Sequence, residues 1–145
     1  MAFRREKKRI GDILLEEQII TQEQLEEALA TAKNEKKKIG EAVVELGYAT
    51  EQSIAEALSS QLGFEYVNLT SVTIPENVLS LIGENVLRRH VMIPYAFNPN
   101  NMNQVLVAMA DPMDMTAIDD FNIVTNLQVV PAVATSNDIF LALDR

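Results

Sequence analysis

Apolar residues in the first 62 positions of the chain recur three or four residues apart. They fall into four short groups: Ile10, Ile13 and Leu14; Leu25, Ala28 and Leu29; Ile39, Val43 and Leu46; and Ile54, Ala57 and Leu58. This spacing places the side chains of each group on one face of a helix. The pattern therefore predicts that the N-terminal part of the chain is entirely helical.

The pattern changes after residue 62. Val-rich runs bounded by Pro, Asn and Asp predict strands over 65–69, 90–97, 104–110 and 127–135. Helical spacing returns over 76–88, 114–125 and 136–143, and the Asn-rich segment 98–103 predicts a hairpin loop. The expected fold class is α+β, with a bundle of two repeated helical hairpins over 1–62 followed by a small mixed α/β subdomain over 63–145.

The helical part contains an internal repeat. When the sequence is shifted by 29 residues, 9–32 aligns with 38–61, and seven of the 24 pairs are identical. The identical pairs are Ile10/Ile39, Gly11/Gly40, Glu16/Glu45, Thr21/Thr50, Glu27/Glu56, Ala28/Ala57 and Leu29/Leu58. Because a solenoid needs at least three copies to bury its core, two copies predict a closed pair of helical hairpins.

Each copy carries its own signals for where helices begin. Thr21 and Thr50 are suited to cap the second helix of their copy, and Gln24 completes a capping box better than Ser53 does. The small residues Ala28 and Ala57 would let the two hairpins approach closely.

The most informative element of the repeat is a triplet of a basic residue, an aliphatic residue and glycine. It occurs as Arg9, Ile10, Gly11 and again as Lys38, Ile39, Gly40. Glycine costs a helix about 1 kcal/mol relative to alanine, but it lets a ligand reach the backbone. A neighbouring Arg or Lys can bind a phosphate or a guanine edge. Two such half-sites would suit a twofold-symmetric ligand with two phosphates, whereas a purely structural role would need the glycines only for hairpin packing.

Composition narrows the possible partners and chemistry. The 145 residues contain 12 Lys and Arg, 21 Asp and Glu, one His and no Cys, for a net charge of −9. Disulfides, Cys-based zinc sites and a thiol nucleophile are thereby excluded, and no metal cofactor is expected. The acidic total argues against DNA or RNA. Residues 1–38, however, hold nine of the basic and eight of the acidic residues, for a local charge of +1.

The two repeated segments, RIGDILLEEQIITQEQLEEALATA and KIGEAVVELGYATEQSIAEALSSQ, are joined by the five residues KNEKK. This arrangement resembles the MshEN domain, the N-terminal regulatory domain of type IV pilus assembly ATPases of the PilB/MshE kind and of related type II secretion ATPases. The family pattern is two 24-residue motifs of the form R-L-G-x-x-L…G…L-x-x-x-L-x-x-Q with a five-residue spacer. QVLVAMADPMD and DDFNIVTNLQVVPAVAT are also similar to the family's C-terminal subdomain.

The resemblance implies that the domain binds cyclic di-GMP, a twofold-symmetric dinucleotide. The residues that the match assigns to the ligand are Arg9, Ile10, Gly11, Leu14, Leu25, Leu29, Lys38, Ile39, Gly40, Val43, Ile54, Leu58, Gln61 and Asp111. Three motif positions differ from the family pattern: Gln18 replaces the glycine of the first motif, Ala32 replaces its final Gln, and Lys38 replaces the Arg of the second.

Asp111 has two interpretations that the sequence leaves open. A carboxylate can accept hydrogen bonds from the N1–H and N2–H of guanine, and the resemblance brings Asp111 towards the ligand. Equally, Asp111 followed by Pro112 is suited to cap a helix. His90 is expected to be structural, and Asp119 and Asp120 to lie on a solvated helix face.

Two non-enzymatic hypotheses follow. The sequence has no G-x-x-x-x-G-K-[ST] motif, so catalysis by this segment is not expected, and the ATPase domains would lie elsewhere in the parent chain. In the first hypothesis the domain senses cyclic di-GMP and controls the motor. In the second it is a docking domain for an inner-membrane platform protein or a pilus assembly protein, without nucleotide binding. Either role places the domain in the cytoplasm, peripheral to the inner membrane.

Overall fold

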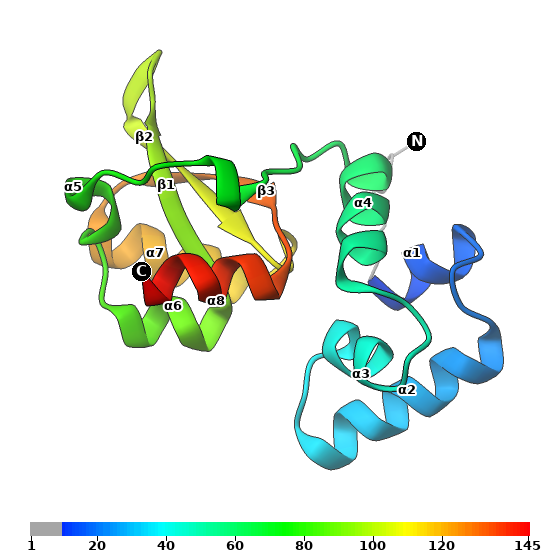
Figure 1. Ribbon diagram of the computed structural model, residues 1–145. Helices are drawn as coiled ribbons and strands as arrows, with labels where there is room; N and C mark the ends of the chain where they lie inside the picture. Colours follow the sequence, from blue (N-terminus) through cyan, green and yellow to red (C-terminus); the bar gives the residue numbers. More distant parts are fainter. Residues whose placement is uncertain (1–9) are drawn as a thin grey trace, which may run out of the picture. The chain divides into compact units, whose positions relative to one another are not determined.

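The computed structural model describes residues 10–145 (Figure 1). The chain divides into two compact units, one ending at Gln61 and the other beginning at Leu62. We refer to residues 10–61 as the helical unit and to residues 62–145 as the sheet unit, and we describe each by itself. The fold class is α+β, as the sequence predicted. None of the helices within residues 10–145 is long and apolar enough to cross a membrane.

The helical unit is built from four helices, two from each copy of the repeat. They are α1 (Ile10–Glu16), α2 (Gln22–Glu35), α3 (Ile39–Glu45) and α4 (Glu51–Leu62, whose last residue belongs to the sheet unit). Helix α2 packs against α3, and α1 contacts both. The two copies are therefore joined by direct helix packing, with the buried side chains of Ile13, Leu14 and Val43 among those of the core.

The helix starts follow the predicted capping signals. The Thr21 hydroxyl accepts from the Gln24 N–H, and the Gln24 side chain accepts in return from the Thr21 N–H, at 3.2 and 2.9 Å. Thr50 and Ser53 form the same reciprocal pair at 3.0 and 3.1 Å. The expectation that Ser53 would serve less well than Gln24 is therefore wrong, because its short hydroxyl reaches the same N–H group.

The sheet unit contains a three-stranded sheet in the order β1-β2-β3. Strands β1 (Met92–Asn98) and β2 (Asn101–Met109) form an antiparallel hairpin, and β2 pairs in parallel with β3 (Gln128–Val133). The connection from β2 to β3 runs through α7 (Met115–Thr125), because parallel neighbours need a crossover. The hairpin loop expected over 98–103 is shorter in the structure, since β2 begins at Asn101.

Short helices complete the sheet unit. They are the 3₁₀ turn η1 (Leu69–Ser71) and the helices α5 (Glu76–Leu79), α6 (Glu84–His90) and α8 (Ser136–Asp144). Helix α8 packs on β1 and β2, and α7 lies against β3 (Figure 1). The core between these elements contains the fully buried side chains of Leu87, Phe121 and Ile139.

Two elements of the sheet unit differ from the prediction. The strand expected over 65–69 is a single bridge between Tyr66 and Val133, because the Asn68 side chain accepts from the Thr70 N–H and turns the chain into η1. The helix expected over 76–88 is divided into α5 and α6. It breaks where Gly83 caps α6 and the buried side chain of Ile82 turns into the core.

Candidate functional site

Three backbone hydrogen bonds at the end of the first helix recur at equivalent positions in the two copies of the repeat. In the first copy the N–H groups of Gln18 and Ile19 donate to the carbonyls of Leu15 and Leu14, at 3.0 and 2.9 Å. In the second copy, 29 residues later, Gly47 and Tyr48 donate to Val44 and Val43, at 3.0 and 3.1 Å. The two copies therefore share one turn geometry, although only the second has the motif glycine.

The two triplet glycines have different surroundings. A Cβ at Gly11 would lie 2.8 Å from Cδ1 of Leu25, so Gly11 permits the close packing of α1 on α2. A Cβ at Gly40 would meet no neighbouring atom within 4 Å. The packing of the chain thus accounts for the glycine of the first triplet. It leaves the glycine of the second triplet with an open backbone at the start of α3.

Of the two basic residues that begin the triplets, the structure describes only Lys38. Arg9 lies outside the described residues. Lys38 caps α3 in extended conformation without a side-chain hydrogen bond to the helix, and its Nζ atom is buried. The neighbouring Lys37 pairs with Glu45 and, at 2.9 Å, with Glu35. These hydrogen bonds, to Glu45 first and Glu35 second, raise the pKa of Lys37 above its ordinary value.

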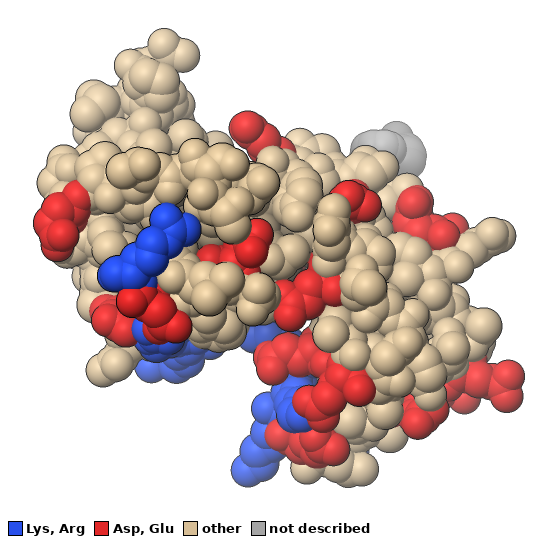
Figure 2. Space-filling view, viewed as in Figure 1, with Lys and Arg blue, Asp and Glu red and all other residues tan. Residues whose placement is uncertain are grey.

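The lysines of the helical unit gather at one edge. Figure 2 shows blue side chains over the end of α2 and the connection to α3, with red acidic side chains around them. They are Lys33, Lys36, Lys37 and Lys38, and they are all of the basic residues between positions 10 and 61. The positive charge of this unit's described residues is therefore concentrated beside the second triplet.

Most of the aliphatic residues that the motif match assigns to the ligand lie in the core. Ile10, Leu14, Leu25, Val43, Ile54 and Leu58 are all buried, at 7 % exposure or less. Ile39 is half-buried, and Leu29 is 50 % exposed although it was expected in the same apolar stripe as Leu25 and Ala28. The accessible apolar surface among these residues is therefore provided by Leu29 and Ile39.

Gln61, near the end of α4, has a partner that the sequence did not predict. Its side-chain amide donates a hydrogen bond to the carboxylate of Glu17, which follows α1. The two residues are 44 positions apart and occupy unrelated places in the two copies, so no local signal could have paired them. This contact brings one predicted ligand residue to the first copy of the repeat.

Asp111 belongs to the sheet unit and does not cap a helix. Its Oδ1 accepts from the Met113 N–H at 3.0 Å, and its backbone carbonyl accepts from the Asp114 N–H at 3.1 Å, which closes a tight turn. A helix capped by Asp111 would begin at Pro112. Helix α7 instead begins three residues later, at Met115, and the Asp114 side chain caps it. The capping interpretation of Asp111 is therefore wrong, because the turn intervenes before the helix.

His90 and Asp120 form a second polar contact in the sheet unit. The His90 Nε2 lies 2.9 Å from Asp120 Oδ2, and the His90 side chain is 12 % exposed. Arg89 approaches the same carboxylate oxygen at 3.9 Å. The structural role expected for His90 fits this contact, whereas Asp120 does not lie on a purely solvated face.

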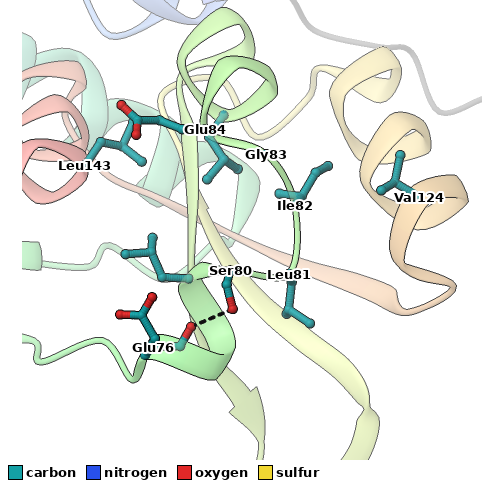
Figure 3. Close-up of a pocket in the computed structure, with 10 residues that line it drawn as sticks. Glu76, Ser80, Leu81, Ile82, Gly83, Glu84, Val124 and Leu143 are labelled. Carbon is teal, nitrogen blue, oxygen red and sulfur yellow. Dashed lines mark hydrogen bonds between the residues drawn. The ribbon is translucent and has the colours of Figure 1, made fainter.

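The sheet unit also has a hollow of about 490 Å³ between α5, α6 and the ends of α7 and α8 (Figure 3). Its lining is mainly aliphatic, with Leu79 at the end of α5, Leu81 and Ile82 on the α5–α6 connection, and Val124 and Leu143 from the ends of α7 and α8. Two carboxylates, Glu76 and Glu84, are its charged groups. None of the ligand residues predicted from the sequence lines it. Within residues 10–145, no group of three or more His, Asp or Glu side chains could hold a metal ion.

Comparison with known proteins agrees with this fold. The profile of the MshEN domain family matches residues 62–145. The chain belongs to the MshEN domain family. It is 28% identical over 138 residues to the type IV pilus assembly ATPase PilB of Myxococcus xanthus (strain DK1622), with 94% of this chain matched. The chain spans about a quarter of that protein's length (24%).

Solved structures share the same architecture. A structure of MshE with cdg superposes with a TM-score of 0.76 and 26% identity, covering 96% of this chain and 99% of that one. The N-terminal domain of XpsE superposes with a TM-score of 0.78 at 20% identity, and 97% of each chain is covered. The second of these likenesses concerns the fold alone.

Proposed function

We propose that the domain binds cyclic di-GMP through its helical unit and thereby regulates the ATPase of which it forms a part. The observation that carries this proposal is Gly40. No packing contact requires a glycine here, because its backbone is open, and Gly40 ends the second of the two basic–aliphatic–glycine triplets, Lys38-Ile39-Gly40. A ligand that approaches the backbone closely gives such a glycine a physical reason.

The other groups that we assign to the ligand supply complementary chemistry. Arg9 and Lys38 supply the cationic donors, and Gln61 supplies an amide that can hydrogen-bond a base edge. Leu29 and Ile39 are the aliphatic residues with surface left to contact a base. MshE, which was solved with cdg and has the same fold, supports this assignment. The role of Asp111 as a guanine acceptor stays a prediction from the motif.

Regulation requires that the ligand distinguish two states of the parent protein. A bound dinucleotide changes the activity of a distant site only if its affinity differs between those states. The match to a pilus assembly ATPase that is about four times as long supports a motor as the regulated partner. We therefore place this domain among the control elements of a pilus or secretion motor.

The test is isothermal titration calorimetry with cyclic di-GMP, with cyclic di-AMP and GTP as controls. We expect saturable binding of cyclic di-GMP and a loss of at least about tenfold in affinity for Arg9→Ala, since a lost base contact costs about 1–3 kcal/mol. Arg145→Ala removes a positive charge in the sheet unit and should bind as the wild type does. Absence of heat at high micromolar ligand would refute the proposal.

A docking domain without nucleotide binding is the second candidate. It is favoured by the exposed aliphatic side chains of Ile123 and Val124 on α7, the second of which borders the hollow of Figure 3. Calorimetry separates the two functions, because the docking hypothesis predicts no heat with any of the three nucleotides. Replacing Ile123 and Val124 by Ser should leave dinucleotide binding unchanged if the first proposal is right.

A further inference from the structure

We infer that Glu17 competes with the ligand for Gln61 and so lowers the affinity of the proposed dinucleotide site. This inference rests on the proposed function. The Glu17 carboxylate accepts a hydrogen bond from the Gln61 side-chain amide. That amide is the group we assign to a base edge, so the ligand must break the contact before Gln61 can bind it.

The competition belongs to one half of the repeat. The shift of 29 residues relates Glu17 to Leu46 and Gln61 to Ala32, and neither Leu46 nor Ala32 has a side chain that can form a hydrogen bond. The contact therefore has no counterpart in the other half, although the turns that carry Glu17 and Leu46 share three equivalent backbone hydrogen bonds. The N–H groups of these two residues donate to Ile13 and Ala42, at 2.9 and 3.0 Å.

The electrostatics act in the same direction as the hydrogen bond. A dinucleotide with two phosphates is a dianion, and a carboxylate that already contacts a ligand residue repels it. Both Glu17 and Gln61 are exposed, so the contact is weak enough for a ligand to displace. Glu17 thus sets a threshold: the domain responds to a higher ligand concentration than it would without this side chain.

Glu17→Ala tests the inference, with Glu26→Ala as a matched control. Glu26 carries the same charge in the same unit and also accepts from a glutamine, Gln22, at 3.2 Å, but Gln22 is not a ligand residue. We expect Glu17→Ala to bind cyclic di-GMP about two- to fivefold more tightly, the effect of removing one exposed charged contact. Glu26→Ala should bind as the wild type does.

A double variant shows whether the gain passes through Gln61. In a Gln61→Ala background the hydrogen bond is already absent, so the further change Glu17→Ala should bring less than half of the gain seen in the wild type. Thermal unfolding of each variant without ligand confirms that all are folded.

Four results would overturn it. Weaker binding by Glu17→Ala would mean that the carboxylate itself contacts the ligand, and equal gains for Glu17→Ala and Glu26→Ala would indicate general charge repulsion. An unchanged affinity in Glu17→Ala would show that the contact does not limit binding. In these three cases the proposed function stands, whereas failure of every variant to bind overturns the proposed function together with this inference.

Discussion

Gln18 and Gly47 occupy equivalent positions in the two copies of the repeat and both have a left-handed backbone, with φ of 60° and 81°. The turn therefore demands this conformation whether or not a glycine is present. A residue with a Cβ pays about 1–2 kcal/mol to adopt it. The first copy has kept the geometry of the second at a cost in stability.

Gln18→Gly should raise the free energy of unfolding by about 1 kcal/mol, because it removes the steric cost of the Cβ. Urea denaturation followed by circular dichroism measures the change. Gly47→Ala places the same penalty on the second copy and should lower the stability by a similar amount. Equal stabilities of wild type and Gln18→Gly would contradict the strain argument.

The two triplet glycines should respond differently to alanine. In Gly40→Ala the new Cβ meets open space, so the variant should gain up to about 1 kcal/mol of stability from helix propensity. In Gly11→Ala the Cβ crowds Leu25, and overpacking costs of about 1–3 kcal/mol should cancel or outweigh that gain. Thermal unfolding of both variants checks the order.

Ligand binding by the same pair extends the prediction. If the open backbone at Gly40 contacts the dinucleotide, Gly40→Ala should bind it more weakly while being the more stable protein. A Gly40→Ala variant that is stabilised and keeps full affinity would show that this glycine is not part of the site.

The contact between His90 and Asp120 should stabilise the sheet unit, since it joins the end of α6 to α7. Asp120→Ala removes the acceptor from a His90 side chain that is only 12 % exposed, and should cost about 1 kcal/mol. Asp119→Ala, at the exposed neighbouring position, should change the stability by less than about 0.5 kcal/mol. Urea denaturation of the two variants gives the comparison, and equal losses would assign no special role to the pair.

The Tyr95 side chain should make the stability of the fold depend on pH in alkaline solution. Burial, together with the nearby charge of Glu65, raises the pKa of Tyr95 to about 12 from its ordinary value of 10.0. Between these values the unfolded chain loses the phenolic proton while the folded chain keeps it. The stabilising effect is therefore complete below pH 10 and is lost as the pH rises towards 12.

Tyr95→Phe isolates this effect from other groups that titrate in the same range. The denaturation midpoint of the wild type should fall between pH 9 and pH 11.5, and the fall should be smaller in Tyr95→Phe. Tyr48→Phe tests the same effect in the helical unit, where a hydrogen bond from the Tyr48 hydroxyl to Glu27 raises the pKa of Tyr48, so this variant should also show a smaller fall. Identical pH profiles for wild type and Tyr95→Phe would contradict the prediction.

Local signals accounted for much of the fold. The helical spacing predicted α1 to α4, and Thr21 and Thr50 marked where α2 and α4 begin. Prediction failed where a local preference met a competing contact. Asp111 is suited to cap a helix, yet its side chain closes a turn with Met113 instead. A continuous apolar pattern over 76–88 did not reveal the break at Gly83.

The sequence by itself determined the repeat and its helices, because these depend on periodicity and on hydrogen bonds between residues a few positions apart. The candidate ligand residues followed from its resemblance to the MshEN motif. Only the tertiary structure decided that Gly11 packs on Leu25 while Gly40 stays open, and that Glu17 holds Gln61. These relationships join residues 14 and 44 positions apart. They arise from how the helices pack against one another, which no local pattern specifies.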